Sequence, residues 1–237
     1  MVSILGSKET KSGGSGGSRE KEVINAVGFV GLGVASAFLG ILAHKTLIRR
    51  IKNADMITPA MIDKQATLRG VVTRVGDADN FRMYHTPLLS LLRRSAILDK
   101  KLTAQDTIHV RLAGVDAPET AHFGKPAQPY ANEALEWLKR TITGEKVAVK
   151  LLRKDRYGRV VGNAQLRAKW YRPWRKNVSM ELTRAGYGSI YEQDGAEYDG
   201  MLDKLRKVEN EARRKKRGMW KQKNVELPAD YKRKHRS

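Results

Sequence analysis

The sequence contains no cysteine among its 237 residues. Disulfide bonds and thiolate metal sites are therefore excluded. The five histidines are spread along the chain without the spacing that is typical of metal ligands. We interpret each of them as a structural or surface residue, and any metal site must then depend on oxygen ligands.

Acidic residues are scarce relative to basic ones. The chain has 25 Asp and Glu against 46 Lys and Arg, which gives a formal net charge of +21. Such an excess of positive charge indicates a polyanionic partner, either a nucleic acid or an anionic membrane surface. A solvated basic surface without any partner is the alternative interpretation.

One segment lacks charge altogether. Residues 23–43, VINAVGFVGLGVASAFLGILA, are bounded by Arg19 and Lys21 on one side and by Lys45 on the other. A helix of this length rises by about 1.5 Å per residue and so spans about 30 Å, the thickness of a bilayer hydrocarbon core. We predict a single transmembrane helix, with a buried soluble helix or a cleaved signal peptide as alternatives. The flanking positive charges are nearly balanced and leave the orientation open.

The composition divides the rest of the chain into four parts. Residues 1–22, which contain SGGSGGS, form a flexible polar segment, because Gly and Ser at this density cannot build a core. Residues 44–65 are a basic linker, residues 66–224 are the folded domain, and residues 225–237 are a basic tail without strong order. We find no internal repeat.

Within the folded domain, apolar residues alternate or recur at helical spacing. Two strands joined by a GDADN turn are expected over 67–85, and further strands over 107–114, 145–152 and 160–166. Helices are expected over 131–142, over 177–186 with Asn177 as N-cap, and over 198–212. This order predicts an α+β fold, a five-stranded OB-type (oligonucleotide-binding) β-barrel packed with about three helices, with the N-terminal transmembrane helix in addition. The insertion at 87–106 and the aromatic, basic loop at 169–176 are left without an assigned role.

Three segments place charged residues where a strand meets a turn: GDADN (76–80), RLAGVDAPE (111–119) and DRYGR (155–159). Cleavage of a phosphodiester needs cationic groups on the phosphate oxygens, carboxylates that hold a hard divalent cation, and a carboxylate that orients or deprotonates water. Taken singly, each segment is more typical of an ordinary turn or a solvated arginine. Taken together they favour one catalytic site.

With these motifs, the chain from about residue 66 to residue 220 resembles the staphylococcal nuclease-like (thermonuclease) family. Within that family it resembles the membrane-anchored probable endonucleases of fungi, to which HFGKPAQPYANEAL and the apolar N-terminal span are similar. The resemblance implies a nuclease that hydrolyses DNA or RNA with one Ca²⁺ ion. It also implies a mitochondrial location, and the sequence indicates no obligate protein partner.

The resemblance also implies roles for individual residues. The phosphate clamp and the water-activating group would be Arg111, Arg159 and Glu119. The metal ligands would be Asp79, Asp116 and the backbone carbonyl of Ala117, with Asp77 and Tyr157 in support. Ala78 stands where the family usually has glycine, and alanine would strain the turn if this position needed a positive φ.

Two other functions stay open from the sequence. One is a non-catalytic nucleic-acid-binding module on the same fold, and the other is a basic domain that docks on anionic lipid. The presence of Arg111, Glu119 and Arg159 favours the enzyme.

Overall fold

The structure is a computed structural model, and it describes residues 36, 37, 40, 49–87, 94–121, 124–167 and 176–234. The chain divides into two compact units, Met1–Leu47 and Ile48–Ser237. The second unit contains the barrel and the candidate site.

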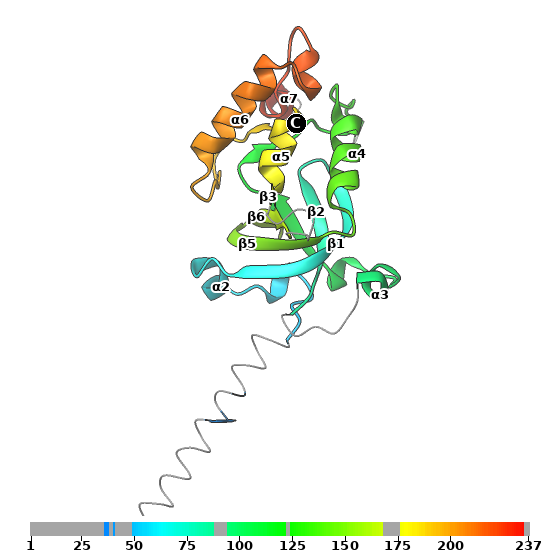
Figure 1. Ribbon diagram of the computed structural model, residues 1–237, viewed down its shortest axis with the longest axis vertical. Coiled ribbons are helices and arrows are strands. Elements are labelled where there is room, and N and C mark those ends of the chain that lie inside the picture. Colours follow the sequence, from blue (N-terminus) through cyan, green and yellow to red (C-terminus); the bar gives the residue numbers. More distant parts are fainter. Residues whose placement is uncertain are drawn as a thin grey trace, which may run out of the picture. The chain divides into compact units, whose positions relative to one another are not determined.

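Five strands form a closed barrel (Figure 1). They are β1 (Thr67–Asp77), β2 (Asn80–His85), β3 (Ile108–Leu112), β5 (Lys146–Lys154) and β6 (Val160–Leu166), hydrogen-bonded in the order β3-β2-β1-β5-β6. A parallel pairing between β3 and β6 closes the ring, whereas the other neighbours are antiparallel. Short β7 (Lys176–Asn177) pairs antiparallel with the end of β6. Outside the barrel, β4 (Val115–Asp116) pairs with β8 (Ser189–Ile190). The predicted five-stranded barrel is confirmed.

The three predicted helices are present as α4 (Ala131–Ile142), α5 (Val178–Arg184) and α6 (Leu202–Arg214). Asn177 caps α5 as predicted, because its side-chain oxygen accepts a hydrogen bond from Met180 N at 2.8 Å. The described residues also form further short helices: η2 (Ala54–Met56), α2 (Pro59–Asp63), α3 (Arg94–Leu98), η3 (Ala104–Asp106), η4 (Gly218–Lys221) and α7 (Pro228–Lys234). Helices α4 to α7 gather at one end of the barrel, and α2 and α3 lie at the other (Figure 1).

The barrel core explains which side chains of β3 are left for function. Ile108, Val110 and Leu112 are buried, whereas His109 and Arg111 alternate with them and are only half-buried. This follows from the period of two along a strand. Arg111 therefore points out of the barrel.

The folded unit begins upstream of the predicted boundary at residue 66. Ala54 and Ile57 are buried in the main core, and the Arg50 guanidinium lies 3.6 Å from the centre of the Tyr84 ring. Residues 49–65 are thus part of the domain rather than only a linker. The end of the basic tail also differs from the expectation, because residues 228–234 form helix α7 instead of a loosely ordered segment.

Several sequence predictions lie outside the described residues. They include the polar segment 1–22, the uncharged segment 23–43 apart from Ser36, Ala37 and Gly40, and residues 168–175 of the aromatic loop. No helix in the described part of the chain has the length and apolar character needed to cross a membrane. The transmembrane helix and the mitochondrial location stay predictions.

His85 gives the domain a pH-dependent stability. The residue is 7% exposed, and its Nδ1 accepts a hydrogen bond from Ile51 N at 3.0 Å. Burial, with the nearby Arg50 charge, lowers the pKa of His85 to about 4 from its usual 6.5. Between these two pH values the unfolded chain binds more protons, so stability is full above pH 6.5 and falls as the pH drops toward 4.

Wild type should lose about 2–3 kcal/mol of unfolding free energy through His85 as the pH falls. We expect His85→Gln, whose side chain does not titrate, to be spared this part of the loss. Urea unfolding of wild type and variant at pH 7.5 and pH 4.5 would measure it. Equal losses in both proteins would show that His85 is not the responsible group.

Candidate active site

The turn between β1 and β2 supplies two of the predicted acidic residues. Asp77 pairs with Asn80 across the hairpin, and the Asp77 side chain accepts a hydrogen bond from Ala78 N at 2.9 Å. Ala78 is fully buried and is not among the residues with positive φ. The strain considered for an alanine at this position is therefore absent, and the methyl group instead fills the core.

Arg111 joins this turn to the segment that follows β3. Its Nη1 lies 2.6 Å from Asp79 Oδ2, and its Nη2 lies 3.2 Å from Asp116 Oδ1. The backbone sets this up, because Leu112 N donates to Asp79 O at 2.9 Å and so holds the turn against the end of β3. The structure thus brings together three of the predicted site residues from two separate segments.

Arg159 reaches the same region through the strand pair that closes the barrel. In the parallel pairing of β3 and β6, Arg111 is opposite Val161. Arg159 directly precedes β6, and its charge is among those that lower the pKa of Asp79, the carboxylate that Arg111 binds. An ion pair at 2.7 Å between Arg159 Nε and Asp155 Oδ2 orients the guanidinium.

Tyr157 lies in the turn before Arg159 and is 68% exposed. The Arg159 guanidinium is 5.2 Å from the centre of its ring, and Arg156 is 4.9 Å from it. An exposed aromatic ring beside arginines is suited to stack on a base next to a bound phosphate.

Glu119 is held at the site by Gln128. Glu119 N donates to the Gln128 side-chain oxygen at 2.9 Å, and Gln128 N donates to Glu119 O at the same distance. Gln128 is 4% exposed, and its other side-chain atom donates to Glu226 O at 3.2 Å. No motif in the sequence marks Gln128, because its side chain joins Glu119 to Glu226, which is 98 residues further along the chain.

Lys232 is a second residue that the sequence analysis missed. It lies on α7, and its Nζ is 2.6 Å from Asp116 Oδ1 and 2.8 Å from Glu119 Oε1. The only sequence signal was the basic character of the tail. Lys232 therefore contacts both a predicted metal ligand and the predicted water-activating group.

The site concentrates negative charge in a buried place. Burial, with the charges of Asp79 and Glu119, raises the pKa of Asp77 to about 6. Burial also raises the pKa of Asp116, although Lys232 and Arg111 oppose this. For Asp79 the effect of burial is outweighed by Arg111, Lys232 and Arg159, which hold its pKa below the usual value. The carboxylates of the site therefore carry more negative charge than the neighbouring arginines and lysine neutralise.

The same donors suit a divalent cation. The Asp116 side chain is only 1% exposed, and its Oδ2 atom is buried without a hydrogen-bond partner. A buried carboxylate oxygen left without a partner is costly unless a cation binds it. No cluster of three or more Asp, Glu or His side chains with metal-binding geometry occurs in the described ranges. Asp79 and Asp116 would therefore need a backbone carbonyl, for which Ala117 is the candidate, and water to complete the oxygen shell that Ca²⁺ prefers.

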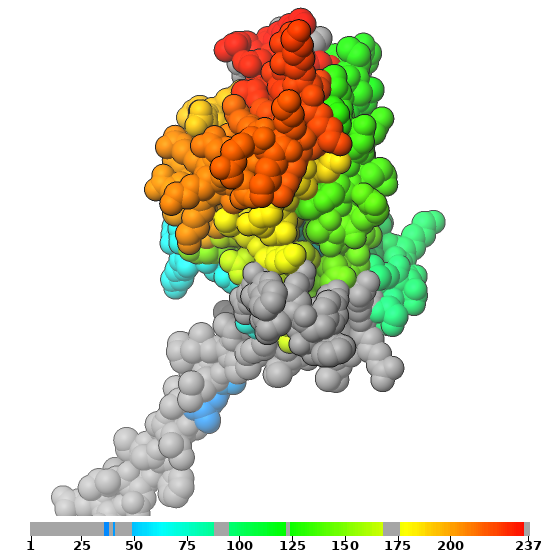
Figure 2. Space-filling view, turned by 45° about the horizontal axis from the view of Figure 1, so that its top comes forward, coloured from blue at the N-terminus to red at the C-terminus, as the bar shows by residue number. Residues whose placement is uncertain are grey.

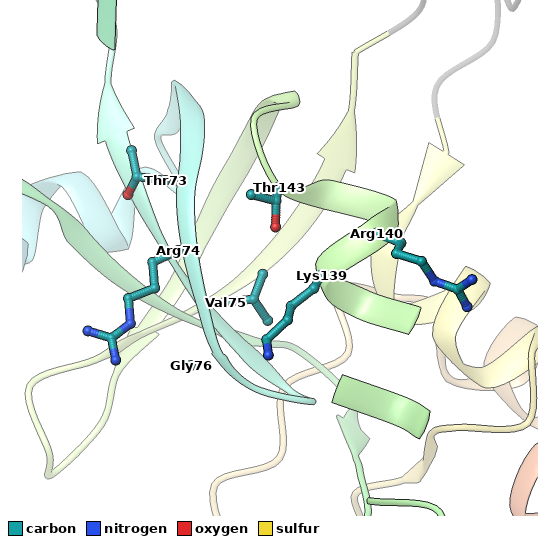
Figure 3. Close-up of a pocket in the computed structure, with 7 residues that line it drawn as sticks. All are labelled: Thr73, Arg74, Val75, Gly76, Lys139, Arg140 and Thr143. Carbon is teal, nitrogen blue, oxygen red and sulfur yellow. The ribbon is translucent and has the colours of Figure 1, made fainter. Parts of the chain in front are cut away.

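A hollow of about 660 Å³ lies elsewhere, between β1 and α4 (Figure 3). The residues around it are Thr73, Arg74, Val75, Gly76, Lys139, Arg140 and Thr143. No acidic side chain lines it, and Arg74 and Arg140 point in different directions. It therefore lacks the groups that phosphodiester cleavage requires.

Comparisons with known proteins identify a family and several relatives. The family model described as "Staphylococcal nuclease homologue" matches residues 109–222, a range that contains Arg111, Glu119 and Arg159. A protein of Schizophyllum commune named "Probable endonuclease LCL3" is 43% identical over 215 residues, which cover 86% of this chain and 73% of that protein. Proteins of the same name from Clavispora lusitaniae and Botryotinia fuckeliana are 43% and 44% identical, and the matches cover 84% and 80% of this chain and 85% and 74% of theirs.

Proposed function

This chain belongs to the staphylococcal nuclease family, and we propose that it is a metal-dependent endonuclease that hydrolyses phosphodiester bonds of DNA, RNA or both. The observation that carries the proposal is the bridge that Arg111 makes between Asp79 and Asp116, beside Glu119. This bridge supports the proposal because it brings together the residues that we propose bind phosphate, bind metal and activate water.

Arg111 and Arg159 would clamp the scissile phosphate. A guanidinium has five N–H donors. In Arg111, Nη1 donates to Asp79 Oδ2 and Nη2 donates to Asp116 Oδ1, so other N–H groups are left to donate. It can therefore keep its bridge and still donate to a phosphate oxygen. Two fixed guanidinium groups stabilise the charge that builds up on these oxygens in the transition state.

Glu119 would take the proton of the attacking water. Its side chain is 14% exposed, so it is reachable from solvent yet held by its backbone bonds to Gln128. The water oxygen forms the new bond to phosphorus, its proton passes to the Glu119 carboxylate, and the P–O bond to the leaving group breaks. Asp79, Asp116 and the Ala117 carbonyl would hold Ca²⁺, which supplies positive charge to the phosphate when bound.

Asp77 and Tyr157 would act in support. Asp77 fixes the turn that carries Asp79 through its bond to Ala78 N. Tyr157 would pack on the nucleotide beside Arg159. We also propose that residues 23–43 anchor the protein in a membrane, which is supported by the uncharged run in the sequence alone.

One preparation of the full chain tests both parts of the proposal. The protein should stay in the membrane pellet after alkaline carbonate extraction, and the detergent-solubilised protein should cut single-stranded DNA or RNA when CaCl₂ is added. A chelator should abolish cleavage, because the phosphate charge then lacks its metal partner. Binding of nucleic acid without cleavage under every divalent metal would instead support the non-catalytic module.

A further inference from the structure

We propose that Lys232 is a further residue of this site, an internal cation that competes with the divalent metal ion for Asp116 and so sets the metal concentration that the enzyme requires. The inference rests on the proposed function of the same carboxylates. It extends that function, because the family model ends at residue 222 and does not include this lysine.

The first support is the geometry of the ammonium group. Lys232 Nζ is within 2.8 Å of oxygens on two different carboxylates, Asp116 and Glu119, whose side chains are 1% and 14% exposed. The Lys232 side chain itself is 33% exposed, and hydrogen bonds between oppositely charged groups are stronger than those between neutral groups. An ammonium in this position occupies space next to the oxygens that a metal ion would need.

The second support is that packing contacts fix the position of α7, the helix that carries Lys232. Tyr231 is buried, and its hydroxyl donates a hydrogen bond to Pro126 O. Pro228 is buried as well, and Glu226 O accepts from the Gln128 side chain at 3.2 Å. The C-terminal residues pack directly beside α4 and the segment before it (Figures 1 and 2).

The other cations of α7 show that this placement is selective. Arg233 is 80% exposed and pairs with Asp230 at 2.9 Å. Lys234 is 71% exposed and lies 3.6 Å from Glu226. Both pair within the tail, so the helix directs only Lys232 of these three residues into the site.

The competition follows from the charges. Asp116 Oδ1 already accepts from Arg111 and Lys232, whereas Oδ2 is buried and without a partner. A divalent ion that binds this carboxylate meets the ammonium charge a few ångströms away, and like charges at such distances repel by an amount comparable to one hydrogen bond. Metal binding must therefore move Lys232 or tolerate its repulsion, and it must also free Glu119 for the water.

Calcium titration of the full chain by isothermal calorimetry, without nucleic acid, tests this inference. Lys232→Met keeps the length of the side chain and removes its charge, so we expect it to lower the dissociation constant for Ca²⁺ about tenfold, the equivalent of one charge-assisted hydrogen bond. Lys232→Arg should bind Ca²⁺ like wild type, since the charge is retained. Lys234→Met is the matched control on the same helix and should change nothing.

Lys232→Gln serves as a second neutral variant, and melting curves show that each protein is folded. Equal or weaker Ca²⁺ binding in both neutral variants would overturn the inference, as would a similar gain in Lys234→Met. Asp116→Asn should lose the binding event, which identifies the site that the titration reports. Because the titration contains no substrate, a chain that binds Ca²⁺ more tightly after Lys232→Met but cuts no nucleic acid would refute only the nuclease.

Discussion

Arg111→Ala should cost the domain about 3–5 kcal/mol of folding free energy in addition to its nuclease activity. The guanidinium is the shared partner of Asp79 and Asp116, whose side chains are 6% and 1% exposed. Without the guanidinium, Asp116 keeps its ion pair with Lys232, but the buried Asp79 loses its ion-pair partner, which is more costly than replacing the whole pair. Urea unfolding at neutral pH measures the loss, and a nuclease assay on the folded fraction separates it from catalysis.

The double variant Arg111→Met with Asp79→Asn separates the two roles of this arginine. It removes a carboxylate together with the guanidinium, so it should recover part of the stability and none of the activity. If Arg111→Ala unfolded at the wild-type urea concentration, the bridge would contribute nothing to stability. Retention of activity in the double variant would remove Arg111 from the proposed phosphate clamp.

Glu119→Gln should reduce the rate of cleavage by about a thousandfold, the order of magnitude that a positioned general base contributes. The change keeps the shape of the side chain, and the bonds to Gln128 are made by the backbone of residue 119. We therefore expect the melting temperature to stay close to that of wild type. Single-turnover cleavage with saturating Ca²⁺ is the measurement.

Glu136→Gln is the matched control for this variant, because Glu136 lies on α4, is 60% exposed and forms an ion pair with Lys139 at 2.7 Å. It should leave the cleavage rate unchanged. A Glu119→Gln protein that cut within tenfold of wild type would show that another group activates the water.

The barrel and the central motifs could be predicted because their signals are local. Alternation along 108–112 places Arg111 on the outer face, and Asn177 marks the start of α5 by its capping bond. The order of strands and helices was then enough to indicate the closed barrel. The segment that carries Asp79 could be recognised for the same reason, since the turn is two residues long between paired strands.

Residues 49–65 and helix α7, on either side of the predicted domain, could not be assigned to the fold from local sequence patterns. Ala54 and Ile57 are buried, and Ile51, Met61 and Ile62 pack partly buried against the same core, but these apolar residues are divided between short helices and follow neither a strand nor a long-helix period. Helix α7 is seven residues long and buries only Pro228 and Tyr231. Its position depends on contacts such as the one from Tyr231 to Pro126, which are 105 residues apart and leave no trace in local composition.

The parallel pairing of β3 and β6 has a consequence for how activity arises during folding. Arg111 lies on β3 and Arg159 directly before β6, and the two strands are joined only when the barrel closes. Contacts between residues far apart in sequence carry the largest loop-closure entropy and dominate the folding time of such topologies. A partly folded chain with β1, β2 and β3 in place would hold Asp79 and Arg111 but lack the second arginine. The recovery of nuclease activity during refolding should therefore report closure of the ring rather than formation of the first hairpin.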